Sequence, residues 1–182
     1  MQEERTIVQR AQKNDPNAFA ELYEAYFDKI YRYIVIKIGD REEAEDMTQQ
    51  VFLKAHKSIS SFKWKGVPFS AWLYRIAHNQ IVDYLRKKTK RPDTLPDEIQ
   101  VSDKPEKNPE QLAEKRMDIQ QLLEATKGLT EAQREVISLR FGGEMPTARV
   151  AEIMGKSQGA IKALQHSAIV SLRKTLLTDS YE

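Results

Sequence analysis

Apolar side chains recur every three or four residues over most of this chain, which is the spacing of one face of an α-helix. In the first half, the pair Asp15-Pro16 predicts the start of a helix, and Gly39 predicts its end. A second helix is predicted from Asp40, and a third from about Phe69 to Lys88. Three amphipathic helices with short connections favour a compact bundle. The predicted inner positions are Phe19, Leu22, Tyr26, Ile30, Ile34, Ile38, Ala44, Met47, Val51, Ala55, Ile59, Phe69, Trp72, Leu73, Ile76, Ile81, Tyr84 and Leu85.

The C-terminal part repeats this pattern with shorter helices. One helix is predicted over 108–128, and a capping box at Thr130 begins another. The last segment predicts a short helix over 147–154, a tight turn at Gly155, and a longer helix that Ser157 caps and that ends near Leu177. This order is typical of a helix-turn-helix, although any two helices joined by a tight turn can show it.

The segment between these two parts differs from both of them. Residues 91–117 are acidic, rich in proline and poor in periodic apolar positions, which predicts a flexible linker rather than an ordered surface loop. The expected fold is therefore all-α. It consists of a helical bundle over 1–90 and a helix-turn-helix domain over 118–182, joined by that linker.

Composition narrows the possible functions. The chain has 182 residues, no cysteine and a formal net charge of +2. The absence of cysteine excludes disulfides, thiolate metal sites and thiol catalysis. The net charge indicates no particular partner, but an acidic block at Asp40–Asp46 and a basic block at Arg86–Arg91 suit different partners. No apolar run is long enough for a membrane span or an N-terminal signal, so we expect a cytoplasmic protein without membrane insertion.

A catalytic or metal site is hard to assemble from this sequence. His56, His78 and His166 have no second histidine at ligand spacing, and no glycine-rich phosphate loop follows a strand. The acidic block lies at a predicted helix N-terminus, where the helix dipole favours carboxylates without any catalytic role. We therefore expect no enzymatic activity, no cofactor and no metal.

The second helix of the helix-turn-helix pattern offers a polar outward face. If Ile161, Leu164 and Ala168 point inward, the 3.6-residue period turns the opposite positions outward. Amide, ammonium and imidazole groups there can bind base edges in a DNA major groove, whereas the alternative is a solvated helix face. The outward positions are Gln158, Lys162, Ala163 and His166, and Thr147, Arg149 and Lys156 flank them as candidate phosphate contacts.

Aromatic and basic residues interleave between Phe62 and Arg91, which is typical of a surface for single-stranded nucleic acid. Phe69 and Trp72 have the spacing of core residues, which favours packing. Trp64 lies between two lysines in a loop, where burial is less expected. Asn79 either binds an extruded base or packs within the helix.

Four segments together resemble the extracytoplasmic function (ECF) type of the sigma-70 family, in the order and spacing of that family. They are AEDMTQQVFLKAHKSI, FSAWLYRIAHNQIVDYLRK, LTEAQREVISLRF and GAIKALQHSAIVSLRK. The resemblance covers about 10–90 and 110–177. It implies a bacterial transcription initiation factor that directs core RNA polymerase to promoters and has no catalytic activity of its own.

The resemblance also implies roles for individual residues. The first domain resembles sigma domain 2, whose second helix docks on the β′ clamp helices of polymerase; the matching positions are Asp46, Gln49, Gln50 and Phe52, with a core role as the alternative for Phe52. Opening of the promoter −10 element is implied for Lys63, Trp64, Lys65, Asn79, Arg86, Lys87 and Lys88. The last domain resembles sigma domain 4, which reads the −35 element and meets the β flap, with Lys162, Ala163 and His166 at reading positions. An anti-sigma factor is a further partner of the family, which no residue here demands.

The sequence departs from the common family pattern at four positions. Gln50 affects a polymerase contact, whereas Arg149, Leu164 and Ser167 lie in the helix-turn-helix, so the individual −35 contacts stay open. Two other functions also remain as alternatives. A stand-alone helix-turn-helix regulator would need a dimer interface or a ligand pocket, and an adaptor would bind proteins only.

Overall fold

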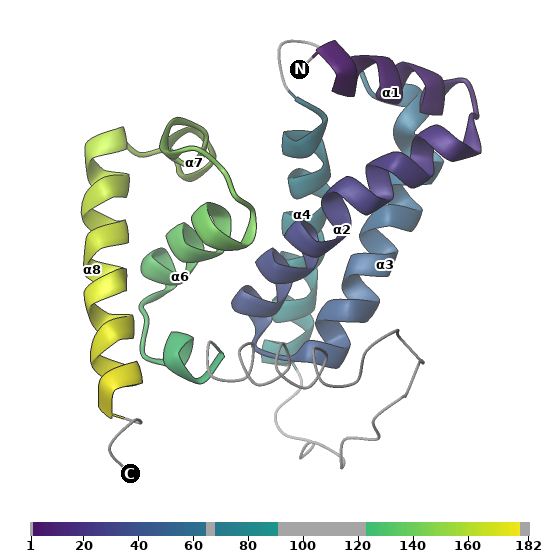
Figure 1. Cartoon of the computed structure of the whole chain (residues 1–182). Helices are drawn as coiled ribbons and strands as arrows, with labels where there is room; N and C mark the ends of the chain where they lie inside the picture. The colour runs from purple at the N-terminus through teal and green to yellow at the C-terminus, as the bar shows by residue number, and fades with distance from the viewer. Residues whose placement is uncertain (1, 65–67, 91–122, 179–182) are drawn as a thin grey trace.

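The computed structural model describes residues 2–64, 68–90 and 123–178, and within these ranges the chain is helical apart from short connections. The elements are α1 (Gln2–Gln12), α2 (Pro16–Ile38), α3 (Arg41–Ser58), the 3₁₀ turn η1 (Ile59–Ser61), α4 (Phe69–Lys90), α6 (Glu131–Ile137), the π-helical turn η2 (Ser138–Gly142), α7 (Thr147–Met154) and α8 (Gln158–Thr178) (Figure 1). Residues 123–127 add one further helical turn. The prediction of an all-α fold is confirmed.

The capping residues define the ends of α2 and the start of α3 as the sequence predicts. The Asp15 side chain accepts hydrogen bonds from the backbone nitrogens of Asn17 and Ala18, at 3.0 and 3.3 Å. Gly39 ends α2 with a φ of +74°, a left-handed conformation that costs glycine nothing. Asp40 then caps α3 by accepting from the backbone nitrogen of Glu43 at 3.1 Å.

The core of the bundle consists of the apolar stripes of α2, α3 and α4. Ile30, Val51 and Leu73 are fully buried, and the other predicted inner positions are buried or packed against the same core, with one exception. The prediction for Leu85 is wrong, because the packed part of α4 ends at Tyr84 and 38% of Leu85 is exposed.

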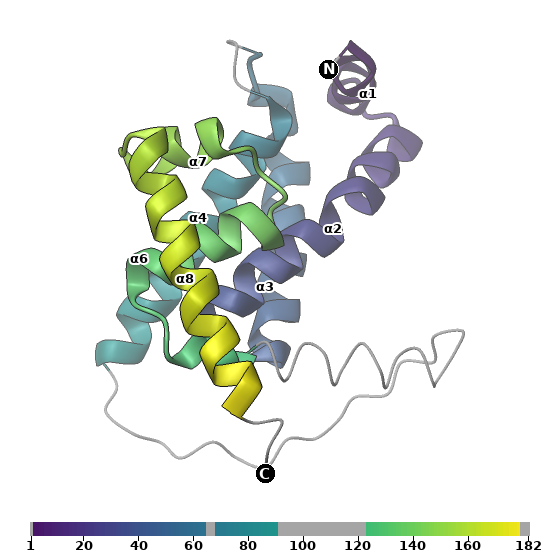
Figure 2. The same cartoon turned by 60° about the vertical axis from the view of Figure 1, so that its left-hand side comes forward.

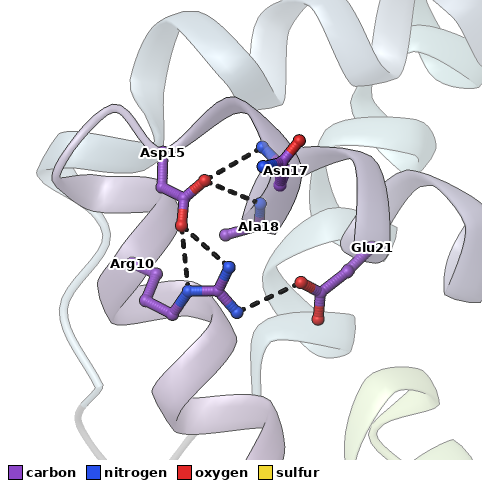
Figure 3. A network of polar contacts seen from close by, with 5 residues as sticks. All are labelled: Arg10, Asp15, Asn17, Ala18 and Glu21. Atoms are coloured by element: carbon purple, nitrogen blue, oxygen red, sulfur yellow. Dashed lines mark hydrogen bonds and ion pairs between the residues drawn. The ribbon is translucent and has the colours of Figure 1, made fainter.

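Helix α1 was not predicted from the sequence pattern. It packs on α2 through Val8 and Ala11, both of which are buried. At its C-terminal end, Arg10 forms ion pairs with Asp15 at 2.8 Å and with Glu21 at 3.1 Å (Figure 3). The same carboxylate that caps α2 therefore also fixes the end of α1.

The C-terminal region contains the predicted helix-turn-helix. Thr130 and Gln133 form a complete capping box at the start of α6. Gly155, with a φ of +62°, turns the chain from α7 towards α8, and Ile161 and Ala168 are the fully buried anchors of α8. The part of the predicted helix over 108–122 lies outside the described residues, as does the predicted linker over 91–117.

The two helical regions pack against each other around one continuous apolar core. In Figure 1, α6 lies between α8 and α2, and the turned view of Figure 2 shows α8 on the outer side. A Cβ atom added to Gly142 would lie 3.0 Å from the backbone nitrogen of Tyr33, so the backbones of η2 and α2 are in direct contact. Lys37 of α2 and Glu135 of α6 form an ion pair at this boundary, and both side chains are nearly buried.

Candidate nucleic-acid interface

The predicted reading face of α8 is on the protein surface. The side chains of Gln158, Lys162, Ala163 and His166 are all exposed. The start of the helix is capped by Ser157, whose hydroxyl oxygen accepts from the backbone nitrogen of Ala160 at 3.2 Å. The four residues therefore project from a capped, rigid helix, as a major-groove reader requires.

Two hydrogen bonds fix α8 against the rest of its region. Gln133 donates to the hydroxyl oxygen of Ser167 at 2.7 Å, and Arg140 donates to the side-chain oxygen of Gln165 at 3.1 Å. The hydroxyl of Ser167 thus links α6 to α8. Among the flanking candidates, Lys156 is exposed, whereas Arg149 is paired with Glu152 at 2.5 Å.

The basic part of α4 is also exposed. Asn79, Arg86, Lys87 and Lys88 all face solvent. Asn79 and Arg86 are seven residues apart and therefore share one face of the helix. Val82, with 47% of its surface exposed, lies on that face between them. The sequence analysis did not identify Val82 as part of this surface, although its position outside the core spacing of α4 indicates that it is exposed.

The segment after η1 combines buried and half-exposed rings. Phe62 is buried against Phe69 and Trp72, with ring centroids 5.8 and 5.2 Å apart, so these three aromatics form the base of the segment. Trp64 is only half-buried and meets Phe62 edge-on at 5.8 Å. Lys63 is exposed, and Lys65 lies outside the described residues.

The predicted polymerase-binding residues of α3 do not all lie on the surface. Asp46, Gln49 and Gln50 are exposed, but Phe52 is 3% exposed and contacts the rings of Tyr23 and Phe27. Phe52 therefore serves the core. Its neighbour Leu53 is 60% exposed and shares one helix face with Asp46 and Gln50, which makes it the apolar residue of that surface.

Several carboxylates lie close together at the N-terminal end of the α3 surface. The pKa of Glu43 is raised from its ordinary value, first by partial burial and then by the neighbouring charges of Asp40 and Asp46. The negative charge of this end is therefore concentrated, which suits a basic protein partner and disfavours DNA.

A separate cavity of about 420 Å³ lies between the two regions. It contains the buried hydroxyl of Tyr74, which has no hydrogen-bond partner within the described residues, and the Tyr33 hydroxyl, which lies 3.3 Å from Nδ1 of His78. None of the predicted site residues lines it.

Within the described ranges, no three histidine or acidic side chains lie close enough together to hold a metal ion. No helix in these ranges is long and apolar enough to cross a membrane.

The geometry thus gives three surfaces with different chemistry, on α3, α4 and α8. Residues 22–91 match the Sigma-70 region 2 family, and residues 125–174 match the Sigma-70, region 4 family. The two matches cover the helices that carry the α3 and α4 surfaces and the α8 surface.

Curated relatives align along nearly the whole chain. The ECF RNA polymerase sigma factor BldN of Streptomyces coelicolor is 36% identical over 96% of this chain and 66% of its own length. The ECF RNA polymerase sigma factor SigW of Bacillus subtilis is 31% identical over 93% of this chain and 94% of its own length. The solved structure of CnrH in complex with the cytosolic domain of CnrY has the same fold, with a TM-score of 0.68 at 22% identity over 97% of this chain and 98% of that chain. This chain therefore belongs to the ECF group of the sigma-70 family, the non-enzymatic factors that direct RNA polymerase to promoters.

Proposed function

We propose that this sigma factor engages a promoter with two separate surfaces while α3 holds it on core RNA polymerase. The observation that carries the proposal is the segregation of exposed groups. Most of the exposed charges on α4 and α8 are basic, whereas the exposed charges in the N-terminal half of α3 are mostly acidic, with the amides of Gln49 and Gln50 beside them. Residues 1–90 would act at the −10 element and residues 118–182 at the −35 element, with 91–117 between them.

The −35 element is the proposed target of α8. Gln158, Lys162 and His166 supply groups that can bind base edges, and Ala163 leaves room for a thymine methyl group. The support for this role is that all four are exposed on one capped helix while Ile161 and Ala168 anchor its other face.

The −10 element is the proposed target of α4 and the preceding segment. Arg86, Lys87 and Lys88 would contact the phosphates of the duplex, and Asn79 would contact an extruded base. Lys63, Trp64 and Lys65 would support the opened strand. The exposure of the first group and the half-exposed ring of Trp64 support this assignment.

Polymerase is the proposed partner of α3. Asp46, Gln49, Gln50 and the exposed Leu53 would contact the β′ clamp helices, with Phe52 supporting this face from the core. The C-terminal region would meet the β flap. An anti-sigma factor is proposed as a further partner, and the cytoplasm as the location, because both are usual for this family.

Transcription by core polymerase with and without the chain tests the proposed function. Mapped start sites that appear only with the chain, and that are lost in the Lys162→Ala/His166→Ala variant while that variant still co-purifies with polymerase, would support it. Tight, specific binding of a duplex promoter by the chain alone would contradict it and favour a stand-alone regulator. A net charge of +2 provides little non-specific attraction, so we expect weak binding without polymerase.

Trp64 provides a test of the opening step. We expect Trp64→Ala to reduce transcription from a duplex promoter about tenfold, because a stacking contact contributes roughly 1–3 kcal/mol per base. Transcription from a template that is already melted around −10 should fall much less. Equal losses on both templates would remove Trp64 from the opening step.

A further inference from the structure

The cavity of about 420 Å³ between the two regions has one wall from each of them. One face of α4, together with α2, forms the first wall, and α6, η2 and α7 form the second. A cavity of this volume at the interface of two domains is a usual setting for a small-molecule site. The lining residues on which the inference depends are Tyr33, Tyr74, Arg75, His78, Glu135 and Met154. Because the walls come from both regions, the cavity exists only while the regions are docked.

Three polar side chains of this cavity already have partners within the protein. The Tyr33 hydroxyl lies 3.3 Å from Nδ1 of His78 and 3.5 Å from a carboxylate oxygen of Glu135. Lys37 neutralises Glu135 in a nearly buried ion pair. These three groups are therefore occupied, and Glu135 adds no net negative charge to the cavity.

The hydroxyl of Tyr74 is different, because it is buried without a hydrogen-bond partner among the described residues. Tyr74 is 4% exposed, and burial raises the pKa of its hydroxyl above the ordinary value, so the group stays protonated at neutral pH. A buried donor that meets no acceptor destabilises the fold. A ligand that brings an acceptor into the cavity removes this penalty, so the hydroxyl is a preformed binding group.

The next residue of α4 supplies a positive charge. Arg75 lines the same cavity, is exposed, and forms no ion pair with an acidic side chain within the described ranges. Its charge is not balanced by Glu135, which is paired with Lys37. A carboxylate is the ligand group that suits both Tyr74 and Arg75, since it carries the opposite charge and its two oxygens only accept hydrogen bonds.

The rest of the lining favours an aromatic ligand body. The rings of Tyr33 and Tyr74 meet edge-on with their centroids 5.3 Å apart, and the thioether of Met154 lines the same cavity. Aromatic rings pack well against other rings and against thioethers. The expected ligand is therefore a carboxylic acid with a compact aromatic body.

We propose that this cavity binds a small aromatic carboxylic acid, whose carboxylate accepts from Tyr74 and Arg75 and whose ring packs between α4 and α7. Such a ligand touches both regions, so it binds only the docked form and holds the regions together. At ten times its dissociation constant, the ratio of docked to open chains rises about elevenfold. The inference goes beyond the proposed function, because it gives the factor a chemical input that needs neither DNA nor polymerase.

The first test uses phenylbutyrate as the probe, with calorimetry and NMR on the full chain. We expect it to bind roughly tenfold more tightly than phenylbutylamine, which has the same ring and chain but a charge that Arg75 repels. NMR should show contacts of the probe ring with the methyl groups of both Ala71 and Met154. Equal binding of the acid and the amine, or contacts with only one region, would overturn the proposal.

Tyr74→Phe tests the buried hydroxyl. We expect it to weaken phenylbutyrate binding about tenfold, because a hydrogen bond to a charged group is lost. The melting temperature without probe should stay the same or rise, because the unpaired hydroxyl is removed. Tyr84→Phe is the matched control, since it removes a hydroxyl of α4 outside the cavity. Unchanged binding in Tyr74→Phe, or an equal loss in Tyr84→Phe, would contradict this role of the hydroxyl.

Arg75→Gln tests the charge. Because Arg75 is exposed, we expect a smaller loss, of about fivefold for phenylbutyrate, and a weaker preference for the acid over the amine. Arg173→Gln is the matched control, since it removes an exposed arginine of α8 that does not line the cavity. A preference that stays the same in Arg75→Gln would contradict the role of Arg75.

Polymerase binding tests the effect on docking. Phenylbutyrate at ten times its wild-type dissociation constant should weaken binding of core polymerase about tenfold, because the factor has to undock first. At the same concentration Tyr74→Phe should lose only about twofold. Polymerase binding that does not respond to bound probe would overturn the effect on docking. Transcription without probe tests the proposed function by itself, so failure of the ligand site leaves that function standing.

Discussion

At the scale of single residues, exposure distinguishes side chains that look equivalent in the sequence. Phe52 and Leu53 are adjacent and both apolar, yet one is 3% exposed and the other 60%. The helical period places Phe52 beside Val51 and Ala55 on the core side, and Leu53 beside the exposed amides. The structure exposes three of the four residues predicted on α3, but the sequence could not select the exposed apolar residue, because the position of α2 decides which side is covered.

Substitutions at this pair separate binding from stability. We expect Leu53→Ala to weaken co-purification with core polymerase severalfold and to change the free energy of unfolding by less than about 0.5 kcal/mol. Phe52→Ala should instead lower that free energy by about 3–5 kcal/mol, because it leaves a cavity among the rings of α2. Denaturant unfolding and polymerase pull-down measure the two effects. Strong destabilisation by Leu53→Ala, or none by Phe52→Ala, would reverse the assignment.

At the scale of helices, the predicted boundaries were correct where a capping residue marks them. Asp15, Gly39, Thr130 and Gly155 define helix ends through local hydrogen bonds or a left-handed turn, and such signals can be recognised within a few residues. Helix α1 was not predicted, because its apolar face has few residues and these are buried only by contact with α2.

The attachment of α1 should depend on pH through Asp15. The hydrogen bond from Arg10 lowers the pKa of Asp15 below its ordinary value. A lowered pKa in the folded state stabilises the fold above the unfolded pKa of about 3.9, and this stabilisation is lost as the pH falls through the lower, folded value.

Asp15→Asn tests this dependence while it keeps an oxygen that can cap α2. We expect a lower melting temperature than the wild type at pH 7, and a difference that shrinks as the pH falls below about 4. Glu24→Gln, which removes an exposed carboxylate of α2 outside this network, is the matched control. A difference between Asp15→Asn and the wild type that stays constant with pH would contradict the role of the Arg10 pair.

At the scale of the whole molecule, the packing of the two regions sets a limit on promoter recognition. The −35 and −10 elements are about 25 base pairs apart, which at roughly 3.4 Å per base pair is about 85 Å of DNA. A compact chain of this size has a radius of gyration of only about 16 Å. If the two regions bind these elements as proposed, the docked arrangement has to open before both are bound. The sequence gives no sign of this docking, because its contacts join residues about 100 positions apart, as in Lys37 and Glu135.

The Lys37–Glu135 pair should control the opening. Glu135→Ala leaves the Lys37 ammonium without its partner in a nearly buried position, where breaking such a pair costs about 3–5 kcal/mol, or at least a hundredfold in the docking equilibrium. We expect the open form to become populated, and core polymerase to bind more tightly because less of the factor has to undock first. Lys37→Met/Glu135→Leu should restore docking, since an apolar pair needs no charge partner.

Energy transfer between two dyes measures this equilibrium directly. The chain has no cysteine, so Lys57→Cys on α3 and Arg173→Cys on α8 provide two unique labelling positions. Glu152→Ala is the control, because it breaks an exposed pair within α7 rather than one between the regions. Unchanged transfer in Glu135→Ala would show that the pair does not hold the regions together.

The direct backbone contact at Gly142 determines how this opening proceeds. Where main chain touches main chain, a small separation already loses the close packing, and we expect the remaining contacts between the regions to be lost with it. Single labelled molecules should accordingly jump between two transfer efficiencies, with no intermediate level. A promoter would then meet either a closed factor or a fully extended one, which makes commitment to initiation an all-or-none event.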